Sequence, residues 1–180
     1  MEAIQNAILQ SFESLRIHDG MLFDCPIEIE APYDSRKLHE VCINHRLALH
    51  LERSIIPLLN GDEFFVDIEF NREGGNFKKI KAEGREERVR PDIIIHNRRS
   101  GDNKKNFLVV ECKKKNANED KINADVKKLE AFIQDPKYQY EYGLQVTYDD
   151  KNITALLLFS LDGEVKKVPL SLHYDQSTTT

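Results

Sequence analysis

The sequence predicts a single α/β domain in which helices flank a mixed β-sheet. Its 180 residues are enough for one sizeable core and short for two. Two helical patterns precede three strand patterns, and a third helix separates these from three more strands. Strands joined through a helix run parallel with a right-handed crossover, whereas hairpin strands run antiparallel, so the sheet is expected to be mixed. We expect residues 1–175 to form this domain and residues 176–180 to be a disordered tail.

The first two predicted elements are helices. Residues 2–16 carry apolar side chains at spacings of four, four and three, which predicts an amphipathic helix. A second helix is expected over residues 35–56, where Pro57 and Gly61 end it. Apolar side chains surround much of its circumference, so this helix is predicted to be central. Between the two helices, residues 27–30 favour a short strand.

Three strands follow. Apolar and polar side chains alternate from Phe64 to Asn71, the pattern of a half-buried strand, and a Gly-Gly loop comes next. Two apolar strands are predicted over residues 89–96 and 107–113, joined by a basic loop.

The rest of the chain predicts a helix and three strands. Asn118 can cap the helix and Pro136 stops it. Its expected apolar stripe is Ile122, Val126, Leu129 and Ile133. Lys127 and Lys128 flank this stripe and could face the cleft, but we interpret them as solvated residues. The expected strands cover residues 144–148, 153–161 and 164–172.

The charge of the chain is unevenly distributed. The net charge of −5 excludes a protein that coats nucleic acid through bulk positive charge. Residues 72–115, however, hold 14 basic and 7 acidic residues, so this segment carries +7 and the remainder −12. A basic segment of this kind suits a phosphate-binding cleft as well as solvated loops.

Other features favour a cytoplasmic protein. No apolar stretch is long enough to span a membrane, and the first residues lack the basic start and apolar stretch of a signal peptide. Three widely spaced cysteines, Cys25, Cys42 and Cys112, exclude a disulfide scaffold and a cysteine zinc site.

The two apolar strands predict a pair of facing carboxylates. A turn at residues 101–102 sets Ile94 opposite Val109. The same register sets Asp92 opposite Glu111, where like charges destabilise a sheet unless they are compensated.

The repulsion between these two carboxylates could be compensated in two ways. Side chains two positions apart share one face of a strand, so Lys113 joins Asp92 and Glu111. A bound Mg²⁺ could take both carboxylates as ligands. Alternatively, Lys113 neutralises one of them, and the cluster is structural within an unrelated α/β domain.

These motifs resemble the PD-(D/E)xK nuclease superfamily. Pro91-Asp92 is followed by Glu111-Cys112-Lys113 on an apolar strand, within a helix, three strands, helix, strand order. The resemblance covers roughly residues 35–161. Uncharacterised members of the superfamily carry segments similar to four segments of this chain, which are His45–Glu52, Asp67–Arg72, Arg90–His96 and Val109–Lys114.

The resemblance implies a restriction-endonuclease-like αβββαβ core, extended here by an N-terminal helix and a C-terminal hairpin. It also implies a metal-dependent phosphodiesterase in which Asp92 and Glu111 hold Mg²⁺ or Mn²⁺. Lys113 would position the attacking water or stabilise charge on the phosphate. Many members add a helix glutamate, a place that Glu40 fits, with Glu52 and Glu69 as competitors.

Nucleic acid is the partner that the resemblance implies, with DNA favoured over RNA. A homodimer would let a chain of this size cut both strands. A catalytically silent fold that binds nucleic acid or protein is the alternative. The candidate phosphate-contacting residues are Arg72, Arg90, Arg98, Arg99 and Lys114.

Overall fold

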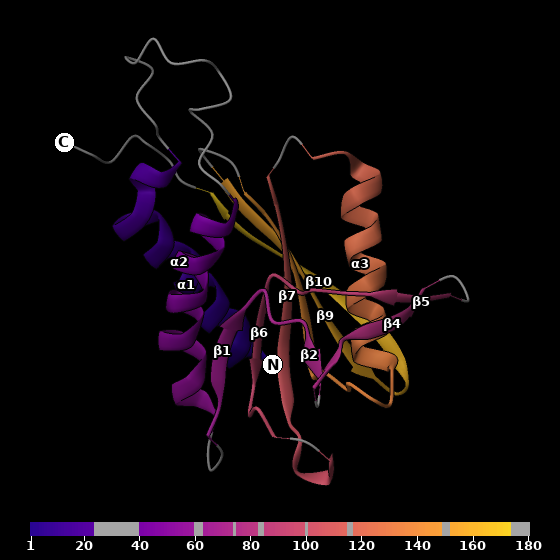
Figure 1. The fold of residues 1–180 in the computed structure, drawn as a ribbon. Helices are drawn as coiled ribbons and strands as arrows, with labels where there is room; N and C mark the ends of the chain where they lie inside the picture. The colour runs from indigo at the N-terminus through magenta and orange to yellow at the C-terminus, as the bar shows by residue number, and fades with distance from the viewer. Residues whose placement is uncertain are drawn as a thin grey trace, which may run out of the picture.

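The computed structural model of the chain has the predicted α/β architecture, with three α-helices and a mixed six-stranded sheet in its described part (Figure 1). It describes residues 1–23, 40–59, 63–73, 75–82, 85–99, 101–114, 117–148 and 152–173. The strand expected at residues 27–30 and the tail at 176–180 lie outside these ranges. No helix in the described ranges is long and apolar enough to cross a bilayer.

The helices lie close to their predicted positions. They are α1 (Glu2–Asp19), α2 (Glu40–Ile55) and α3 (Glu119–Gln134), with short 3₁₀ turns at Gly20–Leu22, Ile56–Leu58 and Gly101–Asn103. Helix α1 continues three residues beyond the predicted end. Contacts with α2 stabilise this extra turn, because Arg46 Nε lies 2.6 Å and His50 Nε2 lies 2.7 Å from the Asp19 carboxylate.

The large sheet contains six strands in the order β1-β6-β7-β8-β9-β10. All neighbours are antiparallel except β7 and β8, which are parallel and joined through α3. The predicted mixed sheet is therefore confirmed. The strands are β1 (Phe65–Ile68), β6 (Ile93–His96), β7 (Asn106–Lys114), β8 (Tyr142–Tyr148), β9 (Asn152–Leu161) and β10 (Glu164–His173).

Two small hairpins between β1 and β6 differ from the prediction. They pair β2 (Arg72–Glu73) with β3 (Asn76–Phe77), and β4 (Lys79–Ala82) with β5 (Arg85–Arg88). We call residues 72–88 the arm. The strand predicted over residues 89–96 is shorter, since Pro91 has no N–H for a ladder and β6 begins only at Ile93.

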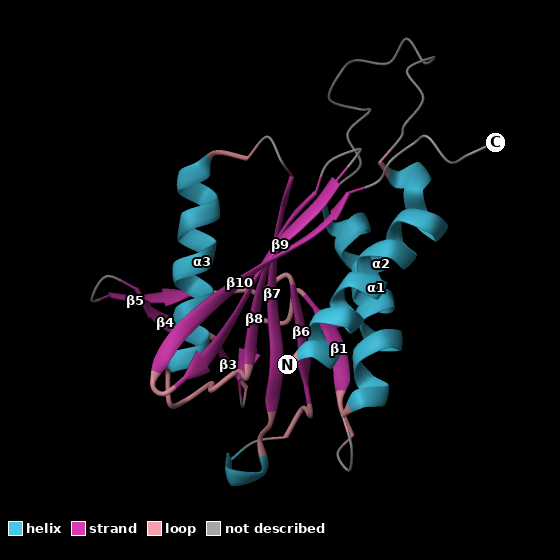
Figure 2. Cartoon of the chain, turned by 180° about the vertical axis from the view of Figure 1, so that it is seen from behind, coloured by secondary structure: helices cyan, strands magenta, loops and turns pink. Residues whose placement is uncertain are grey.

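Helices cover both faces of the sheet (Figures 1 and 2). One core packs α1 and α2 against side chains such as Ile93, Ile95 and Val110. The other packs α3 against Ile94 and Val109, because alternate side chains of a strand point to opposite faces. Cys112 belongs to the first core, so Glu111 and Lys113, on either side of it, face α3.

The register predicted for the β6–β7 hairpin is confirmed in its apolar part. Ile94 pairs with Val109, and Ile93 with Val110. The predicted two-residue turn is wrong, because a 3₁₀ turn occupies Gly101–Asn103 and a bulge shifts the pairing to His96 with Asn106. The register therefore depends on burial of the apolar faces and not on the turn.

Gly143 on β8 sets how closely α3 approaches the sheet. A Cβ atom at this position would lie 3.1 Å from Leu129 Cβ and 3.2 Å from Ile133 Cδ1. Leu129 Cβ is fixed to the helix backbone, so the contact can be relieved only by moving α3. We expect Gly143→Ala to lower the free energy of unfolding by roughly 1–2 kcal/mol, measured by urea denaturation.

Gly20 provides the matched control. A Cβ there meets no atom of the described residues within 4 Å, and its φ of −54° suits alanine. Gly20→Ala is expected to leave stability unchanged or raise it slightly. Equal stability of the two variants would contradict the close approach of α3.

Candidate active site at the interface of β7 and helix α3

Asp92 lies just before β6 and is tied to β7 by a hydrogen bond. Its Oδ2 accepts the Cys112 backbone N–H at 2.7 Å. Burial raises the pKa of Asp92 above its ordinary value, although the Cys112 N–H and the Lys113 ammonium oppose the rise. The hairpin thus brings the two carboxylates of the predicted pair to the same part of the sheet, one residue beyond the Ile93–Val110 pairing.

Glu111 is the most deeply buried member of the group, with 2% of its surface exposed. Burial raises the pKa of Glu111 from 4.5 to about 8; Lys128 opposes the rise, whereas Asp92 and Asp125 add to it. Lys128 Nζ lies 3.1 Å from Glu111 Oε1. That oxygen has no well-aligned hydrogen bond, so the contact compensates the carboxylate only in part.

Asp125 on α3 links the two lysines of the site. Its Oδ2 lies 2.9 Å from Lys113 Nζ and its Oδ1 lies 3.0 Å from Lys128 Nζ. Burial by itself lowers the pKa of both lysines, but the neighbouring carboxylates outweigh it and the net shift is upward. Both ammonium groups therefore stay charged. A chain of contacts runs from Lys113 on β7 through Asp125 and Lys128 on α3 back to Glu111 on β7.

Asp125 was not predicted from the sequence, and the interpretation of Lys128 as a solvated residue is wrong, because Lys128 contacts both Glu111 and Asp125. The predicted stripe put Ile122 and Val126 toward the core, but both are only half-buried, whereas Asp125 is buried. The signal that could have found Asp125 is its spacing: Leu129 and Phe132 follow four and seven residues later and share its helix face. Lys128 is three residues from Asp125.

The three glutamates considered as a further catalytic group are placed differently. Glu40 is the first residue of α2, and its side chain lies outside the described part. Glu52 is exposed on α2, the helix that packs on the opposite face of the sheet. Glu69 lies beside Asp92, since its backbone N–H donates to Asp92 O at 2.9 Å, but its carboxylate pairs with Arg90 at 2.7 Å.

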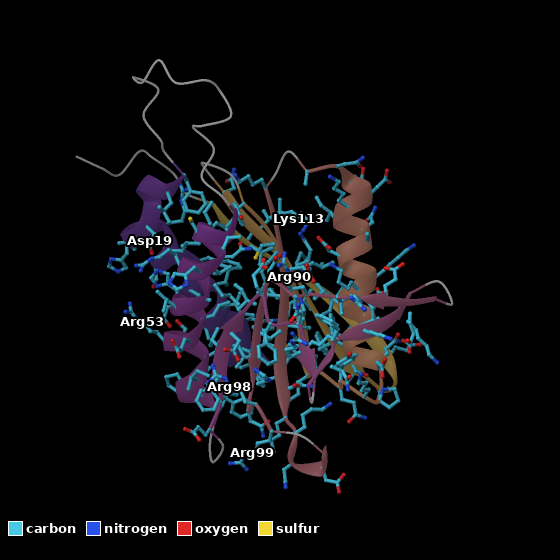
Figure 3. All side chains as sticks on the ribbon, in the orientation of Figure 1. Asp19, Arg53, Arg90, Arg98, Arg99 and Lys113 are labelled. Atoms are coloured by element: carbon cyan, nitrogen blue, oxygen red, sulfur yellow. The ribbon has the colours of Figure 1, made fainter. Side chains whose placement is uncertain are left out.

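The predicted phosphate-contacting residues do not form one patch. Lys113 and Arg90 lie in the middle of the view in Figure 3, whereas Arg98 and Arg99 lie well below them, in the loop that joins β6 to β7. Arg98 is also engaged, because its Nε donates to Asp67 Oδ2 at 2.9 Å.

The two remaining candidates lie elsewhere. Arg72 is on the arm and stacks on an aromatic ring. Lys114 is the half-buried last residue of β7, directly after Lys113.

The donor set suits a hard divalent cation. Mg²⁺ usually takes one or two carboxylates and keeps several waters, and Asp92 and Glu111 are two carboxyl groups that could serve as such ligands. The Glu111 oxygen without a well-aligned hydrogen bond also fits this chemistry. Among the described residues, no group of three or more His, Cys, Asp or Glu side chains is arranged around one metal position.

The raised pKa of Glu111 makes stability depend on pH. Its folded-state pKa of about 8 lies above the ordinary 4.5, so the folded state binds the proton more tightly and loses stability as pH rises between these values. Glu111→Gln removes this loss. We expect the free energy of unfolding of the variant to exceed that of the native protein by roughly 1–3 kcal/mol at pH 8 and by little at pH 5. Urea denaturation in EDTA measures this difference.

Glu13→Gln, an exposed change on α1, is the control and should follow the native pH profile. A Glu111→Gln profile parallel to that of the native protein would mean that Glu111 is ionised in the folded state throughout this range.

Comparisons with known proteins leave the family of this chain undetermined. The chain matches no protein-family model, and no curated protein or solved structure is significantly similar to it.

Proposed function

We propose that this protein is a metal-dependent phosphodiesterase that hydrolyses nucleic acid, with DNA favoured over RNA. The observation that carries the proposal is the burial of Glu111 beside Asp92, on the face of the sheet where two lysines meet. Replacing such a buried ionic cluster by apolar side chains is often neutral or stabilising, so fold stability is a weak reason for it. Acid and lysine groups held together at a sheet are, in contrast, what phosphate chemistry requires.

The order of elements supports the same proposal. The elements α2, β1, β6, β7, α3 and β8 occur in this order along the chain, with the two hairpins of the arm inserted between β1 and β6. This is the helix, three strands, helix, strand order on which the resemblance to the PD-(D/E)xK superfamily rests. A restriction-endonuclease-like core is therefore part of the proposal, with α1 and the β9–β10 hairpin as additions to it.

Asp92 and Glu111 would hold Mg²⁺ or Mn²⁺. The bound ion would supply Lewis-acid polarisation of the scissile phosphate and lower the pKa of a bound water. The Cys112 N–H orients Asp92 for this role by holding one of its oxygens. The cation would replace Lys128 as the main compensation of Glu111.

Lys113 donates a hydrogen bond to the phosphate and places a positive charge beside it. Its ammonium is held by Asp125 at 2.9 Å and by the Cys112 carbonyl at 3.1 Å, so its position is set before substrate arrives. A preset cation stabilises the charge that develops on a phosphate without having to reorganise during the reaction. Asp125 is accordingly a positioning residue.

A catalytically silent binding module is the second candidate. The contact of Lys128 with both Glu111 and Asp125 favours it, because two lysines already offset much of the carboxylate charge without any metal. The two candidates differ in whether a divalent cation displaces Lys128 from Glu111.

Calorimetry with Mn²⁺ separates the candidates. A nuclease should give a saturable heat with the native chain, which Asp92→Ala abolishes because one of two ligands is lost. Asp102→Ala, an exposed change in the β6–β7 loop, should bind Mn²⁺ as the native chain does. Equal and negligible heats for all three proteins would reject the metal site and favour the silent module.

Cleavage of plasmid, single-stranded DNA and RNA in Mg²⁺ tests the roles of the other residues. Lys113→Ala should lower the rate by two or more orders of magnitude, since it removes a preset cation. Asp125→Asn should lower kcat more than it raises KM. It should also move the alkaline limb of the pH profile to lower pH, because loss of the anionic partner lowers the pKa of the Lys113 ammonium. Lys166→Ala, on the distant β9–β10 hairpin, is the control.

Retained cleavage in Lys113→Ala would assign the activity to another site or a contaminant. An unchanged pH profile in Asp125→Asn, together with an unchanged kcat, would leave Asp125 a purely structural residue.

A further inference from the structure

Two arginines of the arm lie close to the ring of an exposed phenylalanine. Phe77 on β3 is 36% exposed, and the guanidinium carbons of Arg72 and Arg88 each lie 4.5 Å from its ring centroid. Arg72 is the cross-strand partner of Phe77, and Arg88 comes from β5. The three side chains form a cluster of one aromatic ring and two guanidinium groups, which we call the Phe77 cluster.

The exposure of Phe77 is enforced by its neighbour. Lys78 is buried, with its Nζ 3.0 Å from the Tyr140 hydroxyl and close to the rings of Tyr138 and Phe70. The Lys78 carbonyl also accepts the Val89 N–H at 3.0 Å. A shift of one residue would bury the phenylalanine and expose the lysine, the arrangement that desolvation alone favours. The structure keeps the opposite arrangement, so burial in the core does not explain Phe77.

The charges of the arm favour an anionic, aromatic ligand. Lys79 is balanced by Glu86 at 3.1 Å, and Arg90 by Glu69 at 2.7 Å. Arg72 and Arg88 instead approach the Phe77 ring. Guanidinium groups contact phosphates and also stack on bases, and an exposed ring stacks bases of any sequence.

We propose that the Phe77 cluster binds an unpaired nucleic-acid strand by stacking one of its bases. Bases in a duplex already have both faces covered by their neighbours, so a stacking site of this kind selects single strands. This binding proposal depends only on residues of the arm. That the bound strand is the substrate of the β7–α3 site rests on the function proposed above.

The position of the arm connects the cluster to that site. Arg88 precedes Asp92 by only four residues, and β4 and β5 extend beside α3 in both views (Figures 1 and 2). A groove of about 1260 Å³ is lined by Ile80, Lys81 and Glu87 of the arm and by residues of α3, including Lys128. A strand held at the arm would thus lie next to the helix that supplies Asp125 and Lys128.

The chain contains no tryptophan, which makes stacking directly measurable. In the Phe77→Trp variant, oligothymidylate should quench the indole fluorescence in EDTA, where no cleavage occurs, because a stacked base quenches an indole ring. A duplex at the same phosphate concentration should quench much less. Ile17→Trp, at a 62% exposed position on α1, is the control and should not respond to either ligand.

Affinity measurements on the unlabelled protein complete the test. Phe77→Ala should weaken binding of oligothymidylate about tenfold, the effect of losing one stacked base. Arg88→Gln should weaken it severalfold and reduce its salt dependence. Arg53→Gln, an exposed arginine on α2 far from Lys113 in Figure 3, should change neither.

The outcomes separate this proposal from the proposed function. Absent quenching in Phe77→Trp, equal quenching by duplex, or native affinity in Phe77→Ala would overturn the stacking site, whether or not the protein cleaves DNA. Quenching by single strands without any Mg²⁺-dependent cleavage would keep the stacking site and reject the nuclease.

Discussion

The buried Glu111 carboxyl group is the constraint on which the β7–α3 half of the structure depends. It lies on an interior strand with 2% of its surface exposed, where an uncompensated carboxylate is strongly unfavourable. Compensation comes from α3, through Lys128 at 3.1 Å and through Asp125, which holds both lysines. The helix must therefore lie at a fixed height along the sheet, since a shift by one turn would separate these charges by about 5 Å.

The local sequence holds α3 at that height. The Asn118 side chain accepts the Asp120 N–H at 2.8 Å and fixes where the helix begins. Gly143 has no side chain, so the helix can approach β8 until Leu129 and Ile133 contact its backbone. Phe132 then packs edge-to-face on Tyr138 and Tyr140. The charged cluster and the apolar contacts thus specify the same helix position.

Strong periodicity made most of this fold predictable, and weak periodicity explains what was missed. The pairing of Ile94 with Val109 was predicted from a two-residue turn that the structure does not have. The pairing is nevertheless correct, because both residues belong to apolar runs that are buried. The arm escaped prediction because its strands have two to four residues and are rich in charge. Asp125 was missed because an apolar stripe could be drawn without it, and the spacing that places it on the face of Leu129 and Phe132 does not by itself show that a charged residue is buried.

The net charge of the β7–α3 site depends on whether Glu111 carries a proton or binds a cation. With Glu111 protonated, as its pKa of about 8 favours near neutral pH, the Asp92 and Asp125 carboxylates balance the Lys113 and Lys128 ammonium groups. A divalent cation that displaced the Glu111 proton would leave this group with one surplus positive charge, which is what a phosphodiester anion neutralises. A silent module would have no such use for a protonatable buried carboxyl. A silent module would keep the Glu111 proton near neutral pH in the presence of Mg²⁺, whereas a catalytic cluster would exchange this proton for the cation.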